Sequence, residues 1–355
     1  MKHINLQDIA HFEALLSKAQ FPVIVTHMKP DGDAMGSCIA MYHYLYKIGK
    51  KPVIAINDEY PAYLSFLTDN MPEKDILTHS ICPDETKKVI MSADMIICLD
   101  FNAFHRTGDL EEALAEAKGE KILIDHHLSP DTKPFELIFS ETEISSASEL
   151  LYHILISTSV INGDAAALPA KASEALMTGM TTDTNNFANS VYPSTLEMAS
   201  ALLSAGVDRD SIITNLYNQH SESRLRLMGH VLKDLMKITD DGVAYIVLDS
   251  NTQKEYNVAE GDTEGFVNMP LSIARVRMSI MMKEDGDKIR VSIRSRKGTS
   301  ANRCARMYFN GGGHENAAGG RLFMPADICS IEAAGEYIER HTHIFFNETS
   351  DESNN

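Results

Sequence analysis

About the first 200 residues of the chain alternate short apolar runs with segments of helical periodicity. Four strands are predicted in this part, at Val23–Thr26, Val53–Asn57, Met95–Asp100 and Lys121–Asp125. Helical patterns cover Gly36–Ile48 between the first two strands and Ser145–Ser157 after the last one. Alternation of this kind is typical of α/β folds, so we predict a doubly wound, mostly parallel sheet.

Three of these strands end in residues that can bind a metal ion. His27 follows the first strand, Asp100 ends the third, and the fourth runs directly into Asp125-His126-His127. A desolvated carboxylate needs a partner, which makes packing a poor explanation for this pattern. Because ligands bind beyond the carboxyl ends of such strands, we expect these side chains to share one site.

Two further groups of carboxylates accompany the strand ends. In the segment that follows the first strand, Pro30 and Gly32 bend the chain so that Asp31 and Asp33 can face His27. Asp183 follows a predicted helix. Carboxylates with a few imidazoles suit Mn²⁺, or Mg²⁺ with water ligands, better than Zn²⁺. Two such ions would neutralise four carboxylates and could promote displacement at phosphorus.

The length of 355 residues favours two domains. We expect a catalytic domain at 1–205, a helical connector at 206–235, a smaller α/β domain at 236–345 and a disordered tail at 346–355. In the second domain we predict a strand at Val243–Asp249, a hairpin whose turn contains Asp285-Gly286, and a helix at Ala301–Tyr308.

The charge and the apolar runs limit the partners of the chain. A formal net charge of -18 argues against long nucleic acid held on a basic surface. Small phosphorylated substrates remain compatible with this negative charge if metal ions supply positive charge at the site. The sequence contains no apolar run of about 20 residues and no Cys-x-x-Cys pair among its five cysteines. We therefore expect a cytoplasmic protein without a membrane partner.

The order and spacing of these groups resemble the DHH phosphoesterase superfamily, for which Asp125-His126-His127 is the naming motif. The run Gly311-Gly312-Gly313-His314-Glu315-Asn316-Ala317-Ala318-Gly319 resembles the signature of the associated DHHA1 domain. The segment Gly265–Ile273 is most similar to the stand-alone subgroup, which includes nanoRNases that also dephosphorylate 3′-phosphoadenosine 5′-phosphate (pAp). The resemblance implies a DHH domain followed by a smaller α/β DHHA1 domain.

The resemblance also implies a role for each site residue. One Mn²⁺ would be held by His27, Asp31 and Asp100. The second would be held by Asp33, Asp100, His126 and Asp183, with Asp100 bridging the two ions. Asp125 would support His126 through the other ring nitrogen. His127 would face the substrate phosphate and assist the leaving oxygen.

Substrate contacts are expected from both domains. Arg106 could clamp a phosphate bidentately and act in catalysis with Asp100 and His127, or it could be a surface arginine. In the second domain Arg294, Ser295 and Arg296 end a strand; alternation places one of the two arginines toward the substrate, and we favour Arg294. The backbone of Gly312 and Gly313 could bind a phosphate, and His314 could donate to it.

The resemblance implies a metal-dependent phosphoesterase that degrades short oligonucleotides (nanoRNA) to mononucleotides and acts as a pAp 3′-phosphatase. Hydrolysis of cyclic di-AMP or its linear product pApA is the closest alternative. A RecJ-like exonuclease is disfavoured because no added nucleic-acid-binding domain is evident, and the glycine-rich run argues against a family II inorganic pyrophosphatase. A non-catalytic nucleotide sensor would be favoured by loss of a metal ligand, and none is lost. A homodimer is compatible with the sequence.

Overall fold

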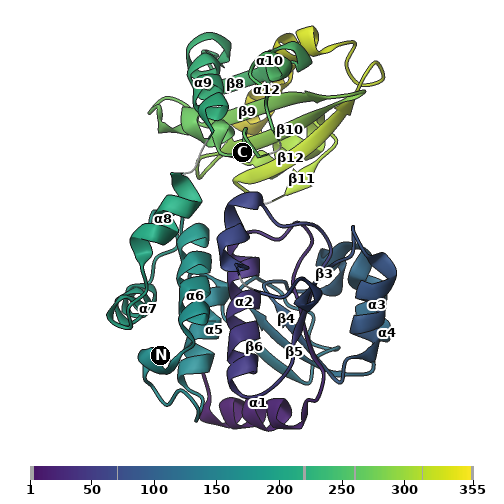
Figure 1. Ribbon diagram of the computed structural model, residues 1–355. Helices are drawn as coiled ribbons and strands as arrows, with labels where there is room; N and C mark the ends of the chain where they lie inside the picture. Colours follow the sequence, from purple (N-terminus) through teal and green to yellow (C-terminus); the bar gives the residue numbers. More distant parts are fainter. Residues whose placement is uncertain (1–3, 70, 219–220, 260, 314, 353–355) are drawn as a thin grey trace. The chain divides into compact units, whose positions relative to one another are not determined.

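The computed structural model describes residues 4–69, 71–218, 221–259, 261–313 and 315–352, with side chains up to 347. The chain forms two compact units, Met1–Gln219 and His220–Asn355 (Figure 1). The segment expected to be a separate connector is instead divided between them. Helix α8 (Arg209–Tyr217) belongs to the first unit, where Ile212 and Leu216 are buried. Helix α9 (Glu222–His230) belongs to the second, where Leu227 is buried.

The first unit contains a six-stranded sheet in the order β3-β2-β1-β4-β5-β6. All neighbouring strands in it are parallel. The strands are β1 (Pro22–Val25), β2 (Val53–Ile56), β3 (Ile76–Thr78), β4 (Met95–Leu99), β5 (Glu120–Asp125) and β6 (Leu137–Ser140). The four predicted strands are confirmed within one residue at each end. The short strands β3 and β6, which lie at the two edges, were not predicted.

Helices cover both faces of this sheet (Figure 1). One face packs against α1 (Leu6–Lys18), α2 (Gly32–Lys47), α5 (Ala147–Ile156), α6 (Ala170–Asp183) and α7 (Pro193–Ser204). The other face packs against α3 (Pro83–Ser92) and α4 (Glu111–Glu116). Alternate residues of each strand enter the two cores: Ile24 joins the first, and Val23 and Val25 join the second. The predicted doubly wound fold is therefore confirmed.

The strand order places a topological switch point between β1 and β4, because the chain leaves β1 in one direction and β4 in the other. Ligands of doubly wound sheets bind at such points. Helix α2 starts directly after the loop that follows β1, one turn earlier than the sequence predicted. Asp31 caps it by accepting hydrogen bonds from the backbone amides of Asp33 and Ala34 at 3.0 and 3.1 Å.

Helices α2 and α6 pack closely because both carry glycine at their contact. A Cβ atom on Gly36 would lie 2.6 Å from the carbonyl oxygen of Ala175 and 2.9 Å from the amide nitrogen of Gly179. Real side chains do not approach backbone atoms so closely. The contact brings the start of α2, with Asp33, near the end of α6, with Asp183.

The second unit is also α/β. Its sheet has the order β11-β12-β10-β9-β8-β7 and is antiparallel except between β8 and β9. The strands are β7 (Lys237–Ile238), β8 (Val243–Leu248), β9 (Met278–Asp285), β10 (Lys288–Ser295), β11 (Gly312–Gly313) and β12 (Ala317–Phe323), and the helices are α9, α10 (Ser250–Glu255), α11 (Ala301–Tyr308) and α12 (Ala334–Glu352). The predicted strand, hairpin and α11 helix of this unit agree with the structure.

Helix α12 corrects the expectation of a disordered tail from residue 346. The helix continues to Glu352. Phe345 and Phe346 are buried in the core of the second unit, and this burial anchors a segment whose polar composition suggested disorder. Within the described ranges, no helix is both long enough and apolar enough to cross a bilayer.

Candidate active site

The polar residues at the ends of β1, β4 and β5 lie together. Asp100 is central to the group: its side chain is almost fully buried and its backbone adopts a left-handed φ of 62°. This conformation is uncommon outside glycine, and such strain concentrates at functional sites. The amide of Asp100 donates to the carbonyl of Ile124 at 3.1 Å, which ties the residue to the next strand.

The two carboxylate oxygens of Asp100 face different histidines. Oδ2 lies 3.4 Å from Nε2 of His27, and Oδ1 lies 3.4 Å from Nε2 of His126. Three overlapping groups of ligand atoms, each with its atoms within 4.8 Å of one another, surround this carboxylate: His27 with Asp31 and Asp100; Asp33 with His126 and Asp183; and Asp100 with His126 and His127. The first group contains the three residues expected for one metal site, and the second contains three of the four residues expected for the other, all except Asp100.

Asp33 is held by the start of helix α5. Its Oδ2 accepts a hydrogen bond from the amide of Ala147 at 2.7 Å, and its Oδ1 accepts one from the amide of Ser148 at 2.9 Å. The N-terminal amides of a helix favour negative charge, so α5 both stabilises and orients this buried carboxylate. The sequence analysis predicted the helix but not this contact, which only the fold creates. In the sequence, the capping serines before Leu150 were the feature that could have indicated this contact, because they mark the start of the helix.

Backbone contacts also fix His27. Nδ1 donates to the carbonyl oxygen of Met28 at 2.9 Å, so that the unprotonated Nε2 can serve as a ligand. Nε2 lies 4.0 Å from Oδ1 of Asp31, the oxygen that also caps helix α2. Two local interactions thus orient the first pair of ligands.

His127 is oriented by Asp125. Its Nδ1 donates to Oδ1 of Asp125 at 2.7 Å, and its backbone amide donates to Oδ2 at 3.2 Å. The sequence analysis expected Asp125 to support His126, and the structure differs. Nε2 of His126 points to three other carboxylates, whereas Nδ1 of His127 lies against Asp125. Nε2 of His127 is therefore left available for another partner.

The close approach of several charged side chains shifts the pKa values of the carboxylates and histidines around Asp100. Burial, with the charges of Asp100 and Asp183, raises the pKa of Asp33 well above its ordinary value. Burial, opposed by His126, raises the pKa of Asp183 to about 6. For His126, burial would lower the pKa, but Asp100 and Asp33 outweigh it and raise the pKa to about 10.

For His27, burial would lower the pKa, but the contact with Asp100 outweighs it and raises the pKa to about 9. Burial acts to raise the pKa of Asp100, but His126 and His27 hold it well below its ordinary range. Without other cations, this many carboxylates share protons with the histidines.

These residues can hold a divalent cation. Oδ1 of Asp100 is buried and accepts no hydrogen bond from any described residue, although it carries negative charge. Such an atom needs a cationic partner. The donor set of carboxylate oxygens and imidazole nitrogens suits Mn²⁺, and the buried like charges would be neutralised by bound cations.

The expected substrate residues differ in how they are placed. Arg106 lies in a short 3-10 helix after β4, and its side chain has no hydrogen bond or ion pair within the described part of the chain. In the second unit the Arg294 guanidinium donates to the carbonyl of Ile293 at 3.0 Å. The hydroxyl of Ser295 donates a short hydrogen bond to the carbonyl of Thr299, and this bond holds the Ser295 side chain against the loop.

The glycine-rich run is more ordered than expected. Gly312 and Gly313 pair with β12, and the amide of Gly313 donates to Oδ1 of Asn302 at 3.1 Å, so this N–H is not open to a phosphate. His314 lies outside the described residues. Asn316, which the sequence analysis did not single out, donates to the hydroxyl of Ser295 and to the carbonyl of Arg296, both at 3.0 Å. It thereby joins the two segments expected to contact substrate.

Comparison with known proteins identifies the family of the chain. The family described as "DHH family, N-terminal domain" matches residues 22–180, and "DHHA1 domain" matches residues 228–330. A solved structure of an exopolyphosphatase-related protein from Bacteroides fragilis is 37% identical, with a TM-score of 0.88, over 97% of this chain and 98% of that one. The chain belongs to the DHH family.

Several relatives carry functional names. The bifunctional oligoribonuclease and PAP phosphatase NrnA of Bacillus subtilis is 26% identical over 85% of this chain and 89% of its own length. The protein of the same name from Thermus thermophilus is 28% identical over 87% and 86%. A shorter match, 24% identical, joins 58% of this chain to 31% of the cyclic-di-AMP phosphodiesterase GdpP of Geobacillus thermodenitrificans.

The same fold occurs in RecJ of Thermus thermophilus, solved in complex with Mn²⁺. That structure is 14% identical with a TM-score of 0.55, and the match covers 95% of this chain and 54% of that one. At this identity the likeness concerns the fold alone.

Proposed function

We propose that this DHH family hydrolase uses two divalent cations, Mn²⁺ being favoured, to cleave short oligonucleotides to mononucleotides and to remove the 3′-phosphate of pAp. The observation that carries the proposal is the position of Asp100. Its two oxygens lie 3.4 Å from two different histidines, as expected for a carboxylate that bridges two ions. The names of the NrnA relatives support the substrate class.

The proposed ligands are those expected from the sequence: His27, Asp31 and Asp100 for one ion, and Asp33, Asp100, His126 and Asp183 for the other. Bound there, two cations would supply an activated water and neutralise charge on the phosphoryl oxygens. The protein keeps the ligands in place through the amides of Ala147 and Ser148 and the carbonyl of Met28.

We assign proton transfer to His127. Because its Nδ1 proton is bonded to Asp125, Nε2 is the atom that can give a proton to the leaving oxygen. The carboxylate of Asp125 stabilises the protonated imidazole before that transfer. Arg106 would bind a phosphoryl oxygen through its guanidinium, and Arg294 is the proposed phosphate contact of the second unit.

A substrate panel tests the proposal. The full chain with Mn²⁺ is given pAp, pApA, cyclic di-AMP, a dinucleotide and a long single strand, and kcat/KM is compared. We expect the dinucleotide and pAp to be preferred. A preference for cyclic di-AMP or pApA would favour the activity named for the partial GdpP match. A preference for the long strand would contradict the proposal.

A further inference from the structure

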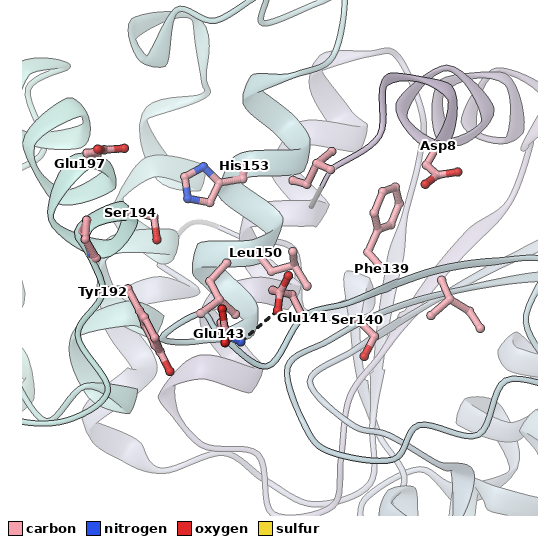
Figure 2. Close-up of a pocket in the computed structure, with 14 residues that line it drawn as sticks. Asp8, Phe139, Ser140, Glu141, Glu143, Leu150, His153, Tyr192, Ser194 and Glu197 are labelled. Carbon is pink, nitrogen blue, oxygen red and sulfur yellow. Dashed lines mark hydrogen bonds between the residues drawn. The ribbon is translucent and has the colours of Figure 1, made fainter. Parts of the chain in front are cut away.

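The first unit contains a pocket of about 380 Å³ whose lining includes Leu150, Tyr192 and Glu197 (Figure 2). The histidine in its wall, His153, is buried and lies 3.5 Å from Oε1 of Glu149 on the same helix. None of the proposed metal ligands lines this pocket. Polar side chains that connect to the proposed site lie instead at the end of β2, the strand that neighbours β1 in the sheet.

Asn57 directly follows β2 and is 7% exposed. Its Oδ1 accepts a hydrogen bond from the backbone amide of Asp109 at 2.9 Å. Its Nδ2 donates a hydrogen bond to Oδ2 of Asp58 at 3.0 Å. An amide donor on one side and a carboxylate on the other determine which end of the Asn57 side chain is oxygen and which is nitrogen. Each end of this buried side chain therefore has a partner, and the two partners belong to different segments of the chain.

The first partner connects Asn57 to Arg106. Asp109 belongs to the 3-10 segment Phe104–Leu110, which carries Arg106. Gly108 turns the chain within this segment with a φ of 64°, which glycine adopts readily. A Cβ atom on Gly108 would lie 2.8 Å from Nδ2 of Asn57, so the turn lies directly against the asparagine. The Asn57 side chain thus holds the backbone just after Arg106.

The second partner connects Asn57 to the loop that carries His27. Oδ2 of Asp58, the atom that accepts from Asn57, also accepts a hydrogen bond from the amide of Lys29 at 2.8 Å. Lys29 has a left-handed φ of 52°. A residue other than glycine keeps such a conformation only where its surroundings impose it. Asp58 therefore holds the loop just after the proposed metal ligand His27.

The two loops are also bonded to each other. The amide of Met28 donates a hydrogen bond to the carbonyl of Arg106 at 2.8 Å. The carbonyl of Met28 accepts the bond from Nδ1 of His27 that orients the imidazole. A closed ring of hydrogen bonds thus joins the loop after β1, the residues after β2 and the 3-10 segment after β4. This ring fixes the backbone of Arg106 relative to His27.

We propose that Asn57 is a positioning residue, which holds Arg106 where its guanidinium meets a phosphoryl group bound beside His27. This inference rests on the proposed function, in which Arg106 binds a phosphoryl oxygen. Asn57 acts through the amide of Asp109 and not by contact with the substrate. A guanidinium binds phosphate with two parallel N–H groups, so a small displacement of its backbone weakens the contact although the charge is kept.

A double-mutant cycle with Arg106 tests this role. The unaltered chain, Asn57→Ala, Arg106→Ala and the double variant are loaded with Mn²⁺, and kcat/KM for pAp and the affinity for AMP are measured. We expect Asn57→Ala to lower both by about tenfold when Arg106 is present, and by less than about twofold when Arg106 is alanine. A general structural defect would act equally in both backgrounds, and that result would overturn the proposal.

Hydrogen exchange in the metal-free chain gives a readout that needs no activity. Asn57→Ala removes the acceptor for the Asp109 amide, so exchange in residues 104–110 should become at least about tenfold faster. Exchange in β4 and β5 should not change, which shows that the fold is kept. Unchanged exchange in residues 104–110 would overturn the proposal whatever the activity of the chain.

Asn251→Ala, an exposed change on helix α10, is the matched control and should behave like the unaltered chain. If Asn57→Ala does not fold, Gly108→Ala disturbs the same contact from the opposite side and should give the same dependence on Arg106. A chain that cleaves neither pAp nor a dinucleotide would contradict the proposed function. An active chain in which the two substitutions act independently would contradict only the role of Asn57.

Discussion

The Nδ1 atom of His127 lies 2.7 Å from Oδ1 of Asp125, and this hydrogen bond fixes which nitrogen of His127 is available for chemistry. Asp125 is fully buried, whereas the side chain of His127 is 23% exposed. A buried carboxylate behind a partly exposed imidazole holds the ring in one orientation.

Asp125→Asn should therefore lower kcat by about 10- to 100-fold and leave KM and Mn²⁺ affinity nearly unchanged. The amide can still contact the ring, but it cannot stabilise an imidazolium. Steady-state kinetics and metal titration measure the two effects. Glu116→Gln, an exposed change on α4, serves as control. A large loss of metal affinity would show that Asp125 acts on the metal ligands instead.

Asp100→Asn should abolish metal-dependent turnover, by at least about 100-fold, while the protein stays folded. Asparagine tolerates the left-handed backbone at this position and keeps the side-chain shape. It cannot supply charge to two cations. Calorimetric titration with Mn²⁺ should show weaker binding and circular dichroism an unchanged fold, with the exposed Asp84→Asn as control. Retained hydrolysis would refute the bridging role.

Gly179→Ala tests the anchoring of Asp33. An added Cβ would lie 2.0 Å from the hydroxyl of Ser148 and 2.8 Å from Oδ1 of Asp33, so α5 and α6 must separate. We expect a loss of about 1–3 kcal/mol in the free energy of unfolding, together with weaker Mn²⁺ binding.

Gly229→Ala in helix α9 is the matched control, because a Cβ there meets no atom within 4 Å. It should be neutral or stabilise the protein by up to about 1 kcal/mol. If denaturant melts give the same change for both variants, the close contact at Gly179 has no energetic role.

Glu149 should contribute to acid stability. Burial acts to raise its pKa, but His153, Ser145 and Thr195 outweigh burial and lower the pKa to about 2, from an ordinary value of 4.5. A depressed pKa stabilises the folded state above about pH 4.5, and this contribution is lost as the pH falls toward 2. The full effect is about 3 kcal/mol.

Glu149→Gln should accordingly flatten the dependence of unfolding free energy on pH between about 5 and 2. Urea denaturation at a series of pH values measures the slope, and the exposed Glu85→Gln provides the comparison. Parallel slopes for Glu149→Gln and the unaltered chain would mean that this carboxyl titrates normally in the folded protein.

The strands β1, β4 and β5 were predictable because each contains an apolar run that is followed by polar residues, and in a parallel sheet such ends meet at one edge. The edge strands β3 and β6 were not predicted: β3 has only three residues, and β6, although as long as β1, pairs with a single neighbouring strand. The helical structure of the C-terminal segment was not predicted either, because Phe345 and Phe346 become buried only against residues distant in sequence.

The sequence by itself determined the class of fold and predicted which side chains gather in the candidate site, since strand ends and motif spacing are local properties of the chain. Only the tertiary structure decided how those residues are paired. Asp125 contacts His127 rather than His126, and α5 holds Asp33 from more than a hundred positions away. Hydrogen bonds and burial depend on which elements pack together, and spacing along one chain does not specify that.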